Sequence, residues 1–178
     1  MLTAAVALFC SAVSFGQAKA PMAKALMAKA ELHNSQGQLV GVATLTEGIN
    51  GVTIVAHVQN LPPGYHGFHI HQTGKCEAPD FKSAGEHFNP QRTEHGLANP
   101  KGPHAGDLPN LLVAPDGVGI IVTRAPMVSL KEGKNSLFHS EGTALIVHSE
   151  PDDLETNPSG ESGDRLACGV IAKATPAM

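Results

Sequence analysis

The stretch from Gly67 to Asp107 constrains this chain most, because histidines, glycines and prolines are concentrated in it. Glycine and proline interrupt it so often that a long helix is excluded. It holds five of the ten histidines of the chain, namely His69, His71, His87, His95 and His104. Imidazoles gathered in a structured loop are typical of a metal site, so the sequence predicts a strand followed by a long metal-holding loop.

Length and composition indicate one folded domain built from strands. A chain of 178 residues with 42% hydrophobic content can bury one sizeable core. The 19 glycines and 13 prolines favour short strands joined by turns. The formal net charge of -4 gives no basic surface for nucleic acid, so a nucleic-acid partner is not expected.

Alternating apolar and polar residues predict about eight short antiparallel strands. Two segments without apolar periodicity, 72–110 and 149–164, are expected to be long functional loops. The prediction is an all-β, eight-stranded antiparallel Greek-key barrel or sandwich of immunoglobulin-like architecture. The strand material lies at 28–33, 39–46, 52–58, 65–71, 111–113, 118–123, 137–138, 144–148 and 167–172.

The first residues resemble a secretory leader. Leu2 to Phe15 is mostly apolar and too short to span a bilayer with ease, and small residues at Ala18 and Ala20 suit a signal peptidase. We therefore expect residues 1–20 to be a signal peptide that is removed, leaving one domain over 21–178. The protein would then be exported to the periplasm or the cell exterior, with no membrane attachment after cleavage.

Removal of the leader leaves Cys76 and Cys168. An even number of cysteines in an exported protein indicates one disulfide, while two unpaired buried thiols are the weaker alternative outside the cytosol. In the chain-entropy model, closing so long a loop stabilises the fold by roughly 4 to 5 kcal/mol, less any strain in the folded state.

Strand periodicity places two imidazoles together. His69 and His71 are two residues apart, so they project from the same face of a strand while Phe68 and Ile70 face the core. A single His-x-His pair is weak evidence, because it occurs by chance. The later residues His87, His95, His104 and Asp107 add three imidazoles and one carboxylate, a set suited to tetrahedral zinc. With His148, four imidazole nitrogens become available, a set that favours copper(II).

Six motifs in order resemble the copper/zinc superoxide dismutases, over about Ala28 to Ala172. These motifs are Gly67-Phe68-His69-Ile70-His71, Gly85-Glu86-His87-Phe88-Asn89-Pro90, His95-Gly96, His104-Ala105-Gly106-Asp107-Leu108, Ala144-Leu145-Ile146-Val147-His148 and Gly163-Asp164-Arg165-Leu166-Ala167-Cys168-Gly169-Val170. The resemblance implies an oxidoreductase that converts superoxide to oxygen and hydrogen peroxide as an antioxidant defence outside the cytoplasm.

The resemblance also implies one copper and one zinc ion per subunit. Copper would be held by His69, His71, His87 and His148, and zinc by His87, His95, His104 and Asp107. His87 would be shared by both metals and would release copper on reduction, take up a proton and return it to the product. Copper would cycle between Cu(II) and Cu(I), and zinc would fix the geometry.

Further residues receive roles from the same resemblance. Asp152 would accept hydrogen bonds from the outer nitrogens of His69 and His95, with Asp153 as the competing candidate. Arg165, with His87, is the predicted catalytic residue, because it would attract the superoxide anion beside copper. The Cys76–Cys168 disulfide would anchor the loop near it.

The predicted loop 149–164 departs from many members of this family, because it contains no lysine that could guide the anion. Arg165 or Lys101 remains as the guiding cation. His33 and His57 are interpreted as outward-facing strand residues, and His66 and His139 are left out of the site. Two other functions compete with the enzyme, a metal-binding module without turnover and a purely structural β-domain. The sequence leaves the oligomeric state open, with a homodimer as one alternative.

Overall fold

A computed structural model describes residues 25–174, which form one antiparallel sheet of ten strands. The predicted signal peptide lies outside the described residues. Neighbouring strands follow the order β4-β6-β7-β3-β2-β1-β9-β8-β5, and β10 pairs with β1. The strands are β1 (Met27–Asn34), β2 (Leu39–Gly48), β3 (Gly51–Val58), β4 (Gly64–His66), β5 (Phe68–His71), β6 (Leu111–Val113), β7 (Gly119–Ala125), β8 (Ala144–His148), β9 (Arg165–Val170) and β10 (Ala172–Ala174).

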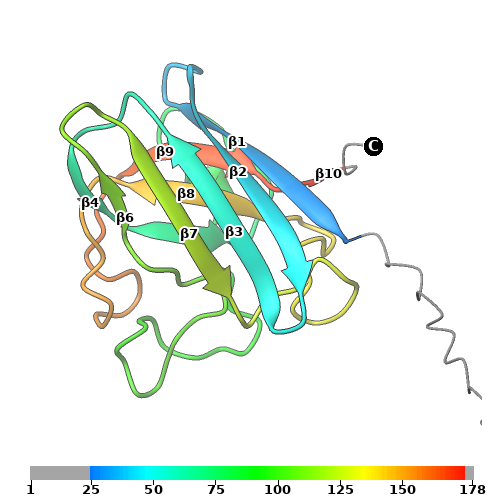
Figure 1. Cartoon of the computed structure of the whole chain (residues 1–178). Helices are drawn as coiled ribbons and strands as arrows, with labels where there is room; N and C mark the ends of the chain where they lie inside the picture. The colour runs from blue at the N-terminus through cyan, green and yellow to red at the C-terminus, as the bar shows by residue number, and fades with distance from the viewer. Residues whose placement is uncertain (1–24, 175–178) are drawn as a thin grey trace, which may run out of the picture.

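The sheet curls into a nearly closed barrel. The long strands β1, β2, β3 and β7 lie side by side across one layer, and β8 and β9 lie behind them (Figure 1). The two end strands of the order, β4 and β5, are consecutive in the chain and are joined by Gly67 alone. The covalent connection therefore brings the two edges together, which leaves little exposed sheet edge. The all-β prediction is confirmed.

The predicted strand over 65–71 is wrong in one respect, because the structure divides it at Gly67. β4 pairs with β6, whereas β5 pairs with β8, so the chain changes partners at this residue. A Cβ atom on Gly67 would lie 2.7 Å from the Cβ of Ser162, so only glycine fits at this crossing. Apolar periodicity cannot reveal such a change of partner, since it reports faces and not neighbours.

The predicted strand at 137–138 is also wrong, since these residues lie in turns. Leu137 is fully buried and Phe138 packs against the core, so their apolar character reflects anchoring of the loop 126–143. The structure also separates β10 from β9. The described part of the chain therefore has ten strands, where about eight were predicted.

The core fills the barrel, and a smaller apolar cluster lies outside its wall. Leu145 and Val147 of β8 point into the large core, while Ala144 and Ile146 pack with Phe81 and Cys168 under the loop that follows β5. Both faces of β8 are therefore covered, which explains its continuous apolar sequence. Both faces of β5 are buried as well, and its residues Phe68 and Ile70 lie in the core.

The two long loops predicted from the sequence are present. The segment 72–110 contains only the short 3-10 helix η1 (Lys82–Ala84), and 149–164 connects β8 to β9 without a strand or helix. In Figure 1 the loop 72–110 extends in green below the barrel, and the loop 149–164 lies in orange beside β4 and β6. Among residues 25–174, no helix is long and apolar enough to cross a membrane.

Candidate metal centre

The wall of the barrel supplies three histidines. His69 and His71 project outward from β5, and His148 ends the neighbouring strand β8, where β5 residues pair with β8 residues from Phe68–Val147 to His71–Ala144. All three rings are at most 3% exposed. The sequence prediction that His69 and His71 share the face opposite Phe68 and Ile70 is confirmed.

The loop 72–110 returns twice along β5 and delivers the other imidazoles. Phe88 N donates to the Ile70 carbonyl at 2.8 Å, and Ile70 N donates to the Gly106 carbonyl at 2.9 Å. These backbone bonds place His87 opposite His71 and Asp107 opposite His69. A Cβ atom on Gly106 would collide with the Ile70 carbonyl oxygen, so this close return requires glycine.

Two groups of four ligand residues result, and His87 belongs to both. In each group one atom per residue lies within 4.8 Å of the others. We call His69, His71, His87 and His148 the strand-held set, since three of its members come from strands. We call His87, His95, His104 and Asp107 the loop-held set, since all four come from the loop 72–110.

In the strand-held set, protein groups bind the outer ring nitrogens and leave the inner ones free. His69 Nε2 donates to Asp152 Oδ2 at 2.6 Å, and His71 Nδ1 donates to the Gly85 carbonyl at 2.8 Å. The inner nitrogens of His71 and His148 face each other at 3.4 Å. His69 Nδ1 and His87 Nε2 are buried and have no hydrogen-bond partner among the described residues.

In the loop-held set, the ligand atoms gather around one carboxylate oxygen. Asp107 Oδ1 lies 2.8 Å from His87 Nδ1, 3.1 Å from His95 Nδ1 and 3.3 Å from His104 Nδ1. The other oxygen, Oδ2, accepts the backbone N–H groups of Gly96 and His104, each at 2.9 Å. Asp107 therefore turns one oxygen to the histidines and uses the other to shape the loop.

Both sets fit a metal ion. Tetrahedral zinc with bonds of about 2.0 Å separates its ligand atoms by roughly 3.3 Å, close to the spacings around Asp107. Buried nitrogens without a partner are costly, and a metal ion would satisfy those of His69 and His87. Three neutral imidazoles with one carboxylate suit zinc, and four imidazoles suit copper(II).

The electrostatics of both sets favour a cation. Burial and the nearby His69 lower the pKa of His87 to about 3 and that of His148 to about 2, so both rings are neutral and can bind metal. Burial raises the pKa of Asp107, but hydrogen bonds from His104 and His87 outweigh it and hold the pKa well below its usual range. For His95, burial lowers the pKa, but the hydrogen bonds to the Asp107 and Asp152 carboxylates outweigh burial and raise the pKa to about 9.

Asp152 joins the two sets. Its Oδ2 accepts from His69 Nε2 at 2.6 Å, and its Oδ1 accepts from His95 Nε2 at 3.0 Å. The structure places Asp152 at this position, whereas the neighbouring Asp153 is exposed and accepts the backbone N–H groups of Glu155 and Thr156. Of the two candidates, only Asp152 is in place to orient these rings.

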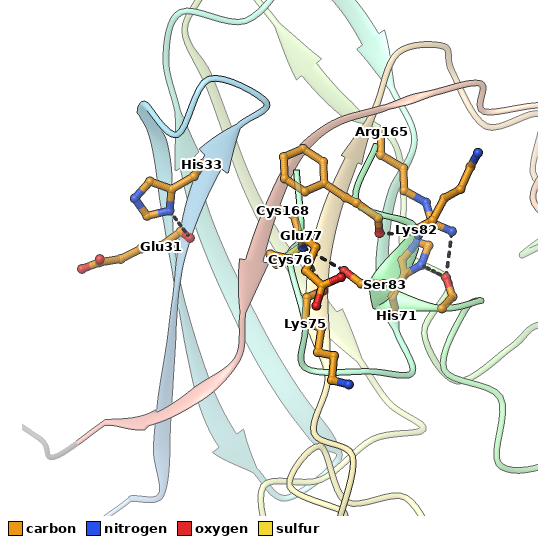
Figure 2. The surroundings of a disulfide bond; sticks show 12 residues. Glu31, His33, His71, Lys75, Cys76, Glu77, Lys82, Ser83, Arg165 and Cys168 are labelled. Carbon is orange, nitrogen blue, oxygen red and sulfur yellow. Dashed lines mark hydrogen bonds between the residues drawn. A yellow bond between two sulfur atoms is a disulfide. The ribbon is translucent and has the colours of Figure 1, made fainter. Parts of the chain in front are cut away.

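Arg165 lies on the side of the strand-held set. Its guanidinium donates to the carbonyls of Phe81 and Gly85, both at 2.7 Å, and His71 Nδ1 binds the same Gly85 carbonyl. The predicted Cys76–Cys168 disulfide is present and holds the start of this loop against β9, close to Arg165 (Figure 2). The guanidinium is therefore fixed relative to His71.

Two clefts reach this region. One, of about 610 Å³, is lined by Arg165 together with Lys82, Asp80, Glu86 and Asp164. The other, of about 370 Å³, is lined by His87, His104 and Glu86. Lys101, considered from the sequence as a guiding cation, lines neither cleft and pairs with Glu94 at 3.1 Å.

The remaining histidines lie outside both sets. His66 is buried and binds the carbonyls of Pro62 and His148, which confirms a structural role. His57 is exposed and His33 half-exposed, as expected for outward-facing strand residues. His139 stacks on Phe88 with ring centroids 5.3 Å apart.

Sequence reasoning missed the groups that support the site through their backbone or amide contacts. The carbonyls of Phe81 and Gly85 hold Arg165, and the Asn110 side chain pairs with the backbone of Asp152. A carbonyl leaves no trace in the residue type, and an asparagine before a strand resembles an ordinary turn residue.

Comparison with known proteins agrees with this geometry. Residues 39–171 match the family model described as copper/zinc superoxide dismutase. The chain belongs to this family. A Cu-Zn superoxide dismutase of Aquifex aeolicus is 50% identical over 148 residues, which cover 82% of this chain and 86% of that protein. A Cu-Zn superoxide dismutase of Caulobacter vibrioides is 42% identical, over 81% of this chain and 84% of its own length.

Solved structures give the same assignment for this dismutase-family chain. The crystal structure of a superoxide dismutase-like protein from Bacillus subtilis is 44% identical and has a TM-score of 0.78, covering 81% of this chain and 97% of that one. Membership of an oxidoreductase family and the superoxide dismutase class, both predicted from the six motifs, are confirmed. The family implies copper and zinc, and the two histidine sets could hold them.

Proposed function

We propose that the protein dismutates superoxide outside the cytoplasm, with copper in the strand-held set and zinc in the loop-held set. The observation that carries the proposal is the pair of buried ligand sets that share His87, whose two ring nitrogens face different sets. Nδ1 of His87 faces Asp107, and its Nε2 has no partner among the residues described. Seven residues thereby offer two four-coordinate sites.

The metals supply the electron chemistry, and the protein supplies geometry and charge. Copper held by the strand-held set would supply, as Cu(II) and Cu(I), the electron transfer that oxidises one superoxide to oxygen and reduces a second to hydrogen peroxide, and zinc in the loop-held set would supply no redox chemistry. Asp152 keeps the Nε2 protons of His69 and His95 in place, which leaves the Nδ1 atom of each ring as the ligand atom.

Arg165 binds the substrate anion. An arginine stays charged at neutral pH, and here its guanidinium is half-buried and held by two carbonyls beside His71. A fixed positive charge at the entrance raises the local concentration of an anion and orients it. Arg165 is therefore a catalytic residue in contact with superoxide.

His87 handles a proton. Peroxide formation consumes protons, and the His87 Nε2 atom faces the strand-held set, where the product forms. A proton held at His87 Nε2 lies within the site and can pass to the product. His87 Nδ1 meanwhile stays directed at Asp107, 2.8 Å away, which keeps the ring in place during the transfer.

An extracytoplasmic location is supported by two features of the chain. The apolar segment Leu2–Phe15 followed by small residues has the pattern of a cleaved leader. The Cys76–Cys168 disulfide is typical of proteins in oxidising compartments. We propose that residues 1–20 are removed and that 21–178 form the mature enzyme.

The test is a superoxide-consumption assay on protein loaded with copper and zinc, together with metal analysis. We expect one ion of each metal per chain and activity that depends on copper. Full occupancy of both metals without superoxide consumption would support a metal-binding module instead. Failure to bind either metal would contradict the assignment of both ligand sets.

A further inference from the structure

Asn110 makes a two-way contact with the residue that links the metal sets. Its side-chain Nδ2 donates to the Asp152 carbonyl at 2.8 Å, and its Oδ1 accepts the Asp152 backbone N–H at 2.8 Å. Both polar ends of the amide are thus used on one residue. Such a pairing fixes the Asp152 backbone in position and in rotation.

The Asp152 side chain needs this support, because it comes from a loop. The segment 149–164 has no strand or helix of its own, and its neighbour Asp153 is exposed. Asp152, in contrast, is 4% exposed and must direct one oxygen to His69 and the other to His95. A rotation of its backbone would break at least one of these hydrogen bonds.

Asn110 links the end of the loop that carries the loop-held set to Asp152 in the loop 149–164. It lies three residues after Asp107 and directly before β6, so its backbone is anchored on both sides. Its partner Asp152 belongs to the loop that carries no predicted ligand. Other contacts also join these loops, among them those from Ala98 N to the Leu154 carbonyl and from His95 N to Asn157 Oδ1, both at 2.9 Å. The Asn110 pair differs from these contacts because it holds the backbone of Asp152 itself.

We propose that Asn110 is a positioning residue that holds the Asp152 carboxylate between His69 and His95, and so keeps both metal sets in their ligand-ready tautomers. It touches neither metal set directly and acts through Asp152. The proposal rests on the proposed function only for the identity of the metals. Loss of the partner behind a ligand histidine typically lowers metal affinity by about 10- to 100-fold, and we expect about 10-fold, since Asn110 stands one residue further out.

The experiment compares Asn110→Ala and Asn110→Asp with a matched control. Asn110→Asp keeps the acceptor for Asp152 N and replaces the donor by a charged carboxylate oxygen that faces the Asp152 carbonyl. The control, Asn135→Ala, removes an asparagine contact of the same 2.8 Å length that is made to Gln91 and not to Asp152. Zinc affinity is measured by competition with a chelator. The Nε2–H protons of His69 and His95 are followed by NMR in the loaded, reduced protein, which is diamagnetic.

We expect Asn110→Ala to weaken zinc binding about 10-fold, and Asn110→Asp to weaken it as well, because its second carboxylate oxygen repels the Asp152 carbonyl. We also expect the Nε2–H protons of His69 and His95 to exchange faster with water in both variants, and to match wild type in Asn135→Ala. If Asn110→Ala does not fold, Asn110→Asp gives the decision. Wild-type zinc affinity and wild-type proton exchange in the Asn110 variants would overturn the proposal. Metal binding by the wild-type chain separates this result from a failure of the proposed function.

Discussion

The two ligand sets are built from different kinds of structure. The strand-held set takes His69, His71 and His148 from β5 and β8, whose pairing fixes their positions. The loop-held set takes its members from a segment without regular structure, shaped by backbone contacts to β5 and by Asp107. His87 belongs to both sets. It therefore joins the strand-held set, which is fixed by strand pairing, to the loop-held set, which depends on polar contacts within the loop.

This difference indicates which contacts stabilise the strand-held set and which stabilise the loop-held set. Strand pairing and the barrel core persist whether or not a ligand side chain is present, so the strand-held set is an addition to a finished wall. In the loop-held set the ligand Asp107 is also the acceptor for two backbone N–H groups. We therefore expect ligand removal to affect chemistry alone in the first set, and chemistry together with folding in the second.

The largest expected effect separates chemistry from folding in the strand-held set. His148→Ala removes one of the four imidazoles while leaving β8 and its pairing intact. Activity should fall by more than about 100-fold, since even outer partners of metal ligands cost up to that amount. Superoxide consumption and copper content measure the loss, and the zinc content should stay near wild type. Destabilisation of the barrel well beyond that caused by the exposed control His57→Ala on β3 would refute the comparison.

Asp107→Ala tests the other half. The substitution removes a ligand of the proposed zinc site and leaves the N–H groups of Gly96 and His104 without their acceptor. Each buried donor left unpaired costs about 1 to 3 kcal/mol, so the free energy of unfolding should fall by roughly 2 to 6 kcal/mol. Denaturant unfolding of both proteins without metal isolates this effect from zinc binding. Asp116→Ala, at an exposed turn where Asp116 accepts from Val118 N, should change stability far less.

The cation proposed to attract superoxide, Arg165, lies beside the strand-held set, and this is a further difference between the two ligand sets. Arg165→Ala should lower the rate about 10-fold and reduce its sensitivity to salt, while copper stays bound. Stopped-flow rates at several ionic strengths measure both effects. Arg124→Ala on β7 changes the net charge equally at an exposed site and serves as control. Unchanged kinetics in Arg165→Ala would remove its role in binding the anion.

The sequence predicted the positions of the ligand residues better than the path of the chain. The strand-held set follows from the two-residue period of His69 and His71 and from the apolar strand before His148. The loop-held residues could be proposed only from their types and from the family resemblance, because Gly and Pro report turns without fixing where a loop returns. The contacts of Ile70 with Phe88 and Gly106, which bring the sets together, involve backbone atoms alone.

Errors in the predicted fold have a similar origin. The change of strand partner at Gly67 and the turn at Leu137 both involve buried apolar residues, and burial alone does not identify the neighbour. Asp152 and Asp153 are equal as residue types, and only the amide of Asn110 and the rings of His69 and His95 distinguish them in the structure.

The acidic residues near the clefts give the smallest expected effect, and they show which cleft the anion uses. Glu86 lines both clefts, whereas Asp164 lines only the one beside Arg165. Removing an exposed negative charge near the path of an anion should raise the rate only about two-fold at low salt, since water screens the charge.

If superoxide enters beside Arg165, Glu86→Gln and Asp164→Asn should both accelerate the reaction. If it enters beside His87 and His104, only Glu86→Gln should do so. Glu132→Gln, in the loop 126–143, lines neither cleft and should leave the rate unchanged. Entry through the cleft lined by His87 and His104 would mean that superoxide reaches the shared histidine without first passing Arg165. The side of the strand-held set that carries Arg165 would then not be the side from which the substrate enters.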